Sequence, residues 1–378
     1  MKFLLISPKN RTVYNFRGDL IKNIILEGYE VVVTGPDVVD VDKIEMLGAR
    51  FVEIPMNKTG TNIVGDMNYC RALRRLMKKE QPDAILGYTV KPVIYGAIAA
   101  KLAGVRNINC MVTGGGYTFT ATTLKARILG VIVRTLYRIG FSCADHVIFQ
   151  NPDDLEEFTQ KGLCKREKCH VVNGSGVNVD HYTVEPFPER TTFFMLSRFL
   201  KSKGVQEYLQ AAELMKQSHP EARFCILGKY ETAMQDAVSQ EFVEDFIRRG
   251  IVERFDETSD VRPYYAMSSV YVLPSYREGT PRTVLEAMSM GRPIITTDTQ
   301  GCRETVVDGK NGYLVPIKDI KALADKMTEF IENPGLIRLM GLESRKYVSE
   351  KFDVKIVNSD MIRIMQLKMP CDAQKEKK

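Results

Sequence analysis

The sequence predicts an α/β protein with two doubly wound domains that face each other across a cleft, and three observations support this prediction. The 378 residues exceed the length of one ordinary domain, which is about 100–200 residues. Short apolar segments alternate with helical patterns in two series, which is typical of parallel sheets with helices on both faces. Between the two series, Tyr182–Thr192 contains two prolines and no periodicity, so we predict that it is a linker.

We therefore expect an N-terminal domain at 1–181, the linker at 182–192 and a C-terminal domain at 193–350. A helix at 351–370 is expected to pack back on the first domain, and 371–378 to form a disordered tail. The strands expected in the first domain are Lys2–Ser7, Glu30–Thr34, Arg50–Ile54, Asp83–Gly87, Asn107–Val112, His146–Gln150 and His170–Val172. Those expected in the second are Phe193–Leu196, Arg223–Gly228, Val270–Pro274, Pro293–Thr297 and Tyr313–Val315. The main helices expected are Gly18–Glu27, Asp66–Lys79, Val93–Ala103, Ile320–Ile331 and Leu336–Lys351.

The composition is that of ordinary globular protein with a mild basic excess. The formal net charge of +6 suits anionic ligands or an anionic membrane surface, and we expect no nucleic-acid partner. The longest apolar runs are shorter than the roughly 18–20 residues that cross a bilayer. The 8 cysteines form no C-x-x-C pair, so we expect neither a metal site nor another cofactor. We recognise no export signal, and therefore expect a cytoplasmic protein without disulfides.

The stretch Ser275–Glu286 reads S-Y-R-E-G-T-P-R-T-V-L-E and follows the apolar run Val270–Leu273, which predicts a buried parallel strand. Thr280 is a favourable N-cap, and Pro281 suits the first position of the helix that follows. A helix N-terminus at the carboxyl end of a parallel strand can bind an anion. We predict that a nucleotide diphosphate binds here.

Two glutamates frame this predicted site. Glu278 lies in the loop and Glu286 lies two turns into the helix. A purely structural interpretation is also open: Glu278 could complement the helix dipole, and Glu286 could pair with Arg282. That pair has the less favourable order, with the arginine N-terminal to the glutamate.

A second loop of the C-terminal domain, Leu196–Gly204, is basic. A diphosphate requires fixed cations, and Arg198 and Lys203 could supply two of them, each in a bond worth about 1.5–3 kcal/mol. A solvated basic turn is the alternative. Both this loop and the loop of Glu278 follow predicted strands of one parallel sheet, so their side chains are expected at the same edge.

Two segments of the first domain give weaker signals. Gly114, Gly115 and Gly116 follow a predicted strand and precede Tyr117; glycines there allow a ligand to approach the backbone, or form a flexible turn. Asp40-Val41-Asp42 has the D-x-D spacing of metal-dependent sugar transferases, and we interpret it instead as acids at the start of a helix.

The stretch Lys125–Phe141 is apolar and interrupted by basic residues. A basic amphipathic helix of this kind can lie in a membrane interface, where each cation near anionic lipid contributes roughly 1 kcal/mol. Packing inside the first domain is the alternative.

These residues resemble the retaining glycosyltransferases of family 4, which have the GT-B fold of two Rossmann-like domains. The resemblance extends over nearly the whole chain and is most specific in P-S-Y-R-E-G-T-P-R-T-V-L-E-A-M at 274–288. Supporting segments are S-R-F-L-K-S-K-G at 197–204, Leu227-Gly228, and G-C-R-E-T-V-V-D-G-K-N-G-Y-L-V at 301–315. In the first domain, Asn15-Phe16-Arg17 and T-G-G-G-Y-T-F at 113–119 resemble a bacterial subgroup that extends sugars on polyprenyl-diphosphate carriers.

The resemblance implies a role for each matched position. Arg198 and Lys203 would hold the donor diphosphate and take part in catalysis with Glu278, which would contact the sugar. Glu286 would bind the ribose hydroxyls. The further donor-binding residues implied are Gly228, Gly279, Thr280, Pro281 and Arg282. On the acceptor side they are Asn15, Arg17, Gly114, Gly115, Gly116 and Tyr117.

The expected reaction is metal-independent transfer, with retention, of a hexose or N-acetylhexosamine (GalNAc or GlcNAc favoured) from a UDP-sugar to a polyprenyl-diphosphate-linked glycan. It would take place on the inner face of the plasma membrane, which Lys125–Phe141 would contact. The chain departs from many relatives in its first loop, Pro8–Thr12, which lacks a glycine pair, and in having no histidine beside Gly114. A nucleotide-sugar epimerase of the same fold and a non-catalytic sugar-nucleotide-binding subunit are the alternatives.

Overall fold

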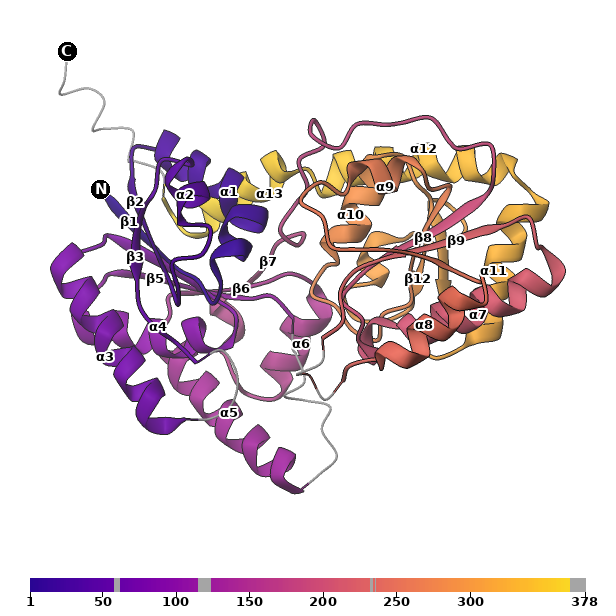
Figure 1. Cartoon of the computed structure of the whole chain (residues 1–378). Helices are drawn as coiled ribbons and strands as arrows, with labels where there is room; N and C mark the ends of the chain where they lie inside the picture. The colour runs from indigo at the N-terminus through magenta and orange to yellow at the C-terminus, as the bar shows by residue number, and fades with distance from the viewer. Residues whose placement is uncertain (58–61, 115–123, 232–233, 235, 368–378) are drawn as a thin grey trace, which may run out of the picture. The chain divides into compact units, whose positions relative to one another are not determined.

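The computed structural model describes residues 1–57, 62–114, 124–231, 234 and 236–367. The chain divides into two compact units, one formed by Met1–Ser175 with Lys355–Lys378 and the other by Gly176–Val354 (Figure 1). The predicted tail at 371–378 and the predicted acceptor-side residues Gly115, Gly116 and Tyr117 lie outside the described residues.

In the described part of the first unit, seven parallel strands form a sheet in the order β3-β2-β1-β4-β5-β6-β7. The strands are β1 (Lys2–Ile6), β2 (Glu30–Gly35), β3 (Arg50–Glu53), β4 (Ala84–Tyr88), β5 (Asn107–Val112), β6 (His146–Phe149) and β7 (Cys169–Val171). The helices are α1 (Asn10–Leu26), α2 (Val41–Glu45), α3 (Ile63–Glu80), α4 (Val90–Ala103), α5 (Leu124–Cys143), α6 (Pro152–Gln160), the 3-10 helix η2 (Arg166–Lys168) and α13 (Val354–Ile364). Because β1 and β4 are adjacent in the sheet, the strand order reverses between them.

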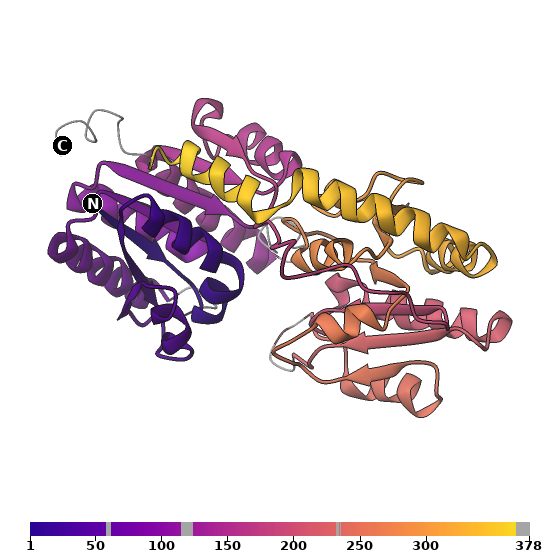
Figure 2. The ribbon, with the colours of Figure 1, turned by 90° about the horizontal axis from the view of Figure 1, so that it is seen from above.

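Helices cover both faces of this sheet. Leu73 of α3, Ala97 of α4, Tyr137 of α5 and Phe158 of α6 belong to the core on one face. The core on the other face contains residues of α1, α2 and α13, so the C-terminal helix packs on the first unit, as Figure 2 shows. Asn107 Nδ2 donates a hydrogen bond of 2.7 Å to the carbonyl oxygen of Met365 in the same contact.

The second unit repeats the architecture with six parallel strands among its described residues, in the order β10-β9-β8-β11-β12-β13. The strands are β8 (Thr192–Leu196), β9 (Arg223–Leu227), β10 (Glu253–Phe255), β11 (Val270–Leu273), β12 (Ile294–Thr297) and β13 (Gly312–Val315). The helices are η3 (Lys201–Lys203), α7 (Val205–Ser218), α8 (Gln240–Arg248), α9 (Arg262–Ala266), α10 (Arg282–Ser289), η4 (Arg303–Thr305), α11 (Ile320–Glu332) and α12 (Gly335–Lys351).

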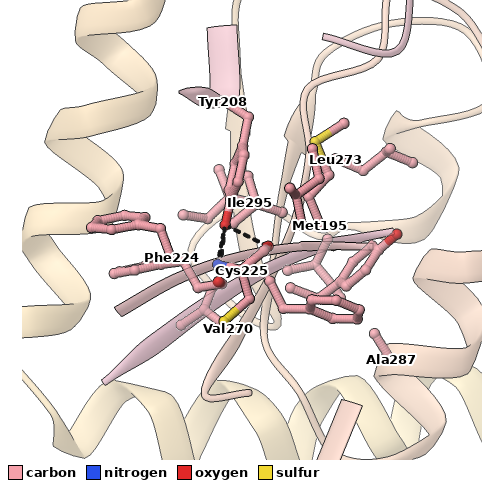
Figure 3. Close-up of a cluster of buried hydrophobic side chains, with 14 of the residues drawn as sticks. Met195, Tyr208, Phe224, Cys225, Val270, Leu273, Ala287 and Ile295 are labelled. Carbon is pink, nitrogen blue, oxygen red and sulfur yellow. Dashed lines mark hydrogen bonds between the residues drawn. The ribbon is translucent and has the colours of Figure 1, made fainter. Parts of the chain in front are cut away.

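The core of the second unit lies between this sheet and its helices. Figure 3 shows part of it, with Tyr208 of α7 pointing toward the strands. Its hydroxyl lies 2.9 Å from the carbonyl oxygen of Phe193 and 3.0 Å from that of Cys225, and it accepts a hydrogen bond of 3.2 Å from Cys225 N. The buried polar atom is therefore satisfied by two adjacent strands, which fixes α7 on the sheet.

The segment predicted as a linker, 182–192, differs from that prediction because it belongs to the second unit, and the chain divides at Ser175 instead. Arg292 is fully buried and donates to the carbonyl oxygens of Glu185 and Pro186 at 2.8 and 3.0 Å. Arg345 donates to the carbonyl oxygen of Tyr182 at 2.9 Å. Two side chains distant in sequence, Arg292 before β12 and Arg345 of α12, thus hold an aperiodic backbone, which no local pattern could reveal.

Candidate functional site

The predicted donor residues lie at the carboxyl edge of the second sheet. In this sheet β8 and β11 are adjacent, and the strand order reverses between them. Ligands of open parallel sheets bind outside the carboxyl ends of the strands at such a switch point. The two loops that leave β8 and β11 here contain Lys203 and Glu278.

Backbone contacts hold these two loops together. The carbonyl oxygen of Ser202 accepts hydrogen bonds from Tyr276 N at 2.8 Å and from Ser275 Oγ at 3.1 Å. Gly204 has a φ of 73°, and a Cβ atom there would lie 2.1 Å from the carbonyl oxygen of Pro274. A side chain at this position would therefore push the loops apart.

Lys203 and Glu278 form an ion pair between Nζ and Oε1, with side chains 22% and 14% exposed. The structure thus brings together two of the three predicted catalytic residues. Glu278 N donates to the carbonyl oxygen of Gln300 at 3.1 Å. Gly301, with a φ of 75°, approaches the same loop so closely that a Cβ atom would lie 2.3 Å from the carbonyl oxygen of Glu278. The backbone of Glu278 is therefore fixed from the side of β12.

Arg198, the third predicted catalytic residue, is exposed, and its Nη1 lies 3.5 Å from the sulfur of Met234. Its loop also contacts the end of β9, where a Cβ atom on Gly228 would lie 1.9 Å from the carbonyl oxygen of Ser197. The predicted donor residue Gly228 is thus needed for the close approach of two backbones.

The start of α10 differs from the prediction. Thr280 is not the N-cap, because the helix begins at Arg282, two residues later; the hydroxyl of Thr280 donates to the carbonyl oxygen of Gly279 at 3.0 Å. Pro281 occupies the cap position in an extended conformation, with a ψ of 108°. Pro281 therefore precedes the first helical residue, which the sequence pattern placed one position earlier.

Glu286 is buried and held on both carboxylate oxygens. Arg282 Nε donates to its Oε1 at 3.1 Å, and the hydroxyl of Tyr265 donates to its Oε2 at 3.1 Å. The ion pair of the structural interpretation is therefore present, despite its less favourable order. Burial, and next the negative charge of Glu286, raise the pKa of Tyr265 well above its usual value, so Tyr265 remains a hydrogen-bond donor.

Two residues that sequence reasoning missed, Asp236 and Glu207, support the loops of the site. Asp236 accepts hydrogen bonds from the backbone N at 3.2 Å and the hydroxyl of Ser202. The hydroxyl of Tyr276 lies 2.5 Å from Oε1 of the buried Glu207. Burial, and next this hydrogen bond, raise the pKa of Tyr276. Asp236 is in an aperiodic segment and Glu207 is inside an ordinary helical pattern, so neither gave a recognisable signal.

In the first unit, two of the predicted acceptor-side residues differ in exposure. Arg17 is buried near the ends of β4 and β5: its Nη2 lies 3.1 Å from the sulfur of Met111, and its guanidinium carbon lies 5.3 Å from the centre of the Tyr88 ring. Asn15 is exposed. Gly114 follows β5 with a φ of 126°, which favours glycine.

The D-x-D segment of the first unit lies at the start of a helix. Asp40 precedes α2 and pairs with Lys43 at 2.6 Å, and Asp42 lies in the first turn. Within the described residues, no group of three or more side chains has the composition and spacing of a metal site.

Two protein families match the chain. The family described as glycosyl transferase 4-like matches residues 2–151, and the family described as glycosyl transferases group 1 matches residues 182–351. These matches and the two parallel-sheet units identify the class: the chain belongs to the group 1 and 4-like glycosyltransferases with the GT-B fold.

Individual relatives extend over most of the chain. It is 26% identical over 354 residues to N,N'-diacetylbacillosaminyl-diphospho-undecaprenol alpha-1,3-N-acetylgalactosaminyltransferase of Campylobacter jejuni, covering 89% of this chain and 91% of that protein. It is 23% identical over 331 residues to UDP-Gal:alpha-D-GlcNAc-diphosphoundecaprenol alpha-1,3-galactosyltransferase of Escherichia coli, covering 84% and 83%. The solved structure of Anabaena HepE in complex with UDP is similar in fold, with a TM-score of 0.78, 19% identity and coverage of 97% and 100%.

Proposed function

We propose that this glycosyltransferase transfers a hexose or N-acetylhexosamine from a UDP-sugar to a glycan carried on a polyprenyl diphosphate, with retention of the anomeric configuration. The observation that carries the proposal is the Lys203–Glu278 ion pair at the switch point of the second sheet. The acceptor class is supported by the names of the Campylobacter jejuni and Escherichia coli relatives, which both include a diphosphate-linked undecaprenol.

The ion pair supports a specific position for the donor. An incoming diphosphate carries more negative charge than one carboxylate, so it would compete with Glu278 for the ammonium of Lys203. Glu278 would then be released to accept hydrogen bonds from the hydroxyls of the sugar. Arg198, exposed on the same loop, would bind a second phosphate oxygen.

Leaving-group stabilisation follows from the same arrangement. Negative charge builds on the diphosphate as the sugar–phosphate bond breaks, and Lys203, Arg198 and the N-terminus of α10 would stabilise that charge without rearranging. Glu286, oriented by Arg282 and Tyr265, keeps further lone pairs for the ribose hydroxyls. We propose that the acceptor hydroxyl attacks from the face that the diphosphate leaves, and that a departing phosphate oxygen takes its proton.

The acceptor would be recognised by the first unit, at the carboxyl edge where Arg17 lies. We also propose that the protein acts on the inner face of the plasma membrane, with the α5 stretch Lys125–Phe141 near the lipid. Val131, Ile132 and Ile139 of this stretch are exposed, while Tyr137 and Phe141 are buried, so the helix takes part in core packing and also offers an apolar surface. Among the described residues, no helix is long and apolar enough to cross a bilayer.

The test is to incubate the protein with each common UDP-hexose and UDP-N-acetylhexosamine and a polyprenyl-diphosphate sugar, with and without EDTA. We expect extension of the glycan with one donor, undiminished by the chelator, and a product whose anomeric configuration by NMR matches that of the donor. A product of inverted configuration would contradict the mechanism. Interconversion of the free UDP-sugar without an acceptor would indicate an epimerase, and UDP binding without any turnover would indicate a non-catalytic subunit.

A further inference from the structure

The exposed face of α3 has an unusual distribution of side chains. Ile63, Val64 and Met67, in its first two turns, are 74%, 68% and 48% exposed. The rest of the exposed face is polar and mostly basic, formed by Asn68, Arg71, Arg74, Arg75, Lys78 and Lys79. Three neighbouring apolar side chains beside five cations form a mixed patch, and apolar patches of this kind often mark interaction sites.

The acids of α3 do not offset this charge at the surface. Within α3, all of whose residues the structure describes, the two acids are Asp66 and Glu80, and both are buried. Asp66 pairs with Lys91 of α4 at 2.7 Å. Glu80 pairs with Lys2 at 2.9 Å and with Arg50 at 2.5 Å, which lowers its pKa and keeps it ionised. The outward face of α3 therefore exposes positive charge only.

Helical geometry places these groups in one continuous stripe. Met67, Arg71, Arg74 and Lys78 follow one another at spacings of four, three and four residues, so they lie along one side of the helix. Arg71, Arg74 and Lys78, with Arg75, line one shallow depression of the surface. Arg74 Nε donates to the carbonyl oxygen of Leu102 at 3.3 Å, which holds this side chain against α4.

Elements near α3 also expose apolar side chains or lack acidic residues. The connection after β2, a strand adjacent to β3, exposes Val38 and Val39 at the carboxyl edge where α3 also begins. Helices α3, α4 and α5 lie side by side in Figure 1, and the sequences of α4 and α5 contain no acidic residue. Helix α6, on the same face of the sheet, does contain acids, at Asp153, Asp154, Glu156 and Glu157.

We propose that the exposed face of α3 binds the anionic surface of a lipid bilayer, with Ile63, Val64 and Met67 inserted among the headgroups and the basic turns on the lipid phosphates. The presence of both apolar and basic side chains favours a bilayer over a soluble polyanion. A soluble polyanion would bind the cations but would leave the three apolar side chains in water. The inference deepens the proposed function, since an acceptor on a lipid carrier would be met at such a surface.

The test measures binding of the full-length protein to vesicles by co-sedimentation, so it does not depend on catalysis. The vesicles are phosphatidylcholine alone or mixed with phosphatidylglycerol, at low and high salt. Changing Arg71→Ser, Arg75→Ser and Lys78→Ser together should weaken binding to the anionic vesicles about 100-fold, since each basic residue contributes about fivefold. Changing Ile63→Ser and Val64→Ser should also weaken binding, and should do so at high salt as well.

Helix α12 supplies a matched control in the second unit, because it also exposes two leucines and two cations. Arg338→Ser, Leu339→Ser, Leu342→Ser and Lys346→Ser together should leave vesicle binding unchanged. Wild-type binding by either α3 variant, or an equal loss in the α12 variant, would overturn the proposal. If changing the basic residues weakened vesicle binding but changing Ile63 and Val64 did not, a bilayer would be contradicted as the partner of this face. That result would indicate a soluble polyanion instead.

Transfer to a short-chain, water-soluble acceptor separates this inference from the proposed function. Folded α3 variants, with an unchanged melting temperature, should retain that activity while losing vesicle binding. A wild-type protein that binds anionic vesicles through α3 but transfers no sugar would contradict the proposed function alone.

Discussion

At the scale of single residues, the Lys203–Glu278 ion pair decides how the donor site is interpreted. The sequence motifs predicted both residues as members of one site, since both follow parallel strands. The direct pairing could not be predicted, because the two residues are 75 positions apart and meet only because β8 and β11 are neighbours. Asp236 and Glu207 were missed for the same reason: their importance depends on tertiary contacts with Ser202 and Tyr276.

We predict that Lys203→Ala weakens UDP binding roughly 10- to 100-fold, because one charge-assisted hydrogen bond to the diphosphate is lost and Glu278 is left without its cation. The measurement is isothermal titration calorimetry. Lys201→Ala is the matched control, since Lys201 is an exposed lysine on the same loop. The affinity of this variant for UDP should stay within about twofold of that of the wild type. Equal affinities for all three proteins would place the diphosphate elsewhere.

At the scale of elements, the sequence patterns predicted the strands more accurately than the loops and helix ends. Helix α1 begins at Asn10, well before the expected Gly18, because the polar residues of its first two turns do not show apolar periodicity. The start of α10 was placed one residue early, because a Thr-Pro pair satisfies both the cap and the first-turn rules, and only the ψ of Pro281 distinguishes them.

The close contact of Gly301 with the Glu278 loop leads to a prediction. Gly301→Ala should destabilise the protein by about 2–4 kcal/mol and lower kcat, since the new Cβ must displace the carbonyl oxygens of Glu278 and Gly279, both 2.3 Å away. Gly250→Ala is the control: its φ is also positive, at 67°, but nothing lies within 4 Å of its Cβ position. It should cost about 1 kcal/mol and leave kcat unchanged. Urea unfolding and initial rates measure both effects, and equal behaviour of the two variants would contradict the assigned contact.

Arg292 accounts for the ordered 182–192 segment. It is fully buried, donates to the carbonyl oxygens of Tyr265, Glu185, Pro186 and Ala266 at 2.8–3.1 Å, and has its pKa lowered to about 10 by burial. Because each of these acceptors would lose its donor, Arg292→Met should destabilise the protein by about 3 kcal/mol or more in urea unfolding. Arg338→Met, on the exposed side of α12, should change stability by less than about 0.5 kcal/mol. A small effect at Arg292 would mean that the segment is held by its apolar contacts alone.

At the scale of the whole molecule, the alternation of strands and helices was sufficient to predict two doubly wound units. It could not give the strand orders, because adjacency in a sheet is set by which helices cross over which face. The sequence pattern also placed the boundary between the two units at the aperiodic segment 182–192. In the structure the first unit ends at Ser175, and the chain returns to it at Lys355. The proposed donor site and the proposed acceptor edge therefore lie on separate units, each with its own core.

This separation predicts where ligands should protect the backbone from hydrogen exchange. UDP should slow exchange in the loops at 197–204 and 275–286, because binding makes local opening less favourable by an amount that grows with the logarithm of ligand concentration over Kd. The carboxyl edge of the first unit, around Arg17, should respond only when an acceptor analogue is added. Mass spectrometry of full-length protein with UDP, with the analogue and with both would measure this, and Lys203→Ala should abolish the UDP response at the same ligand concentration. Protection by UDP around Arg17 instead of the Lys203 loop would assign the donor to the other unit and contradict the proposed site.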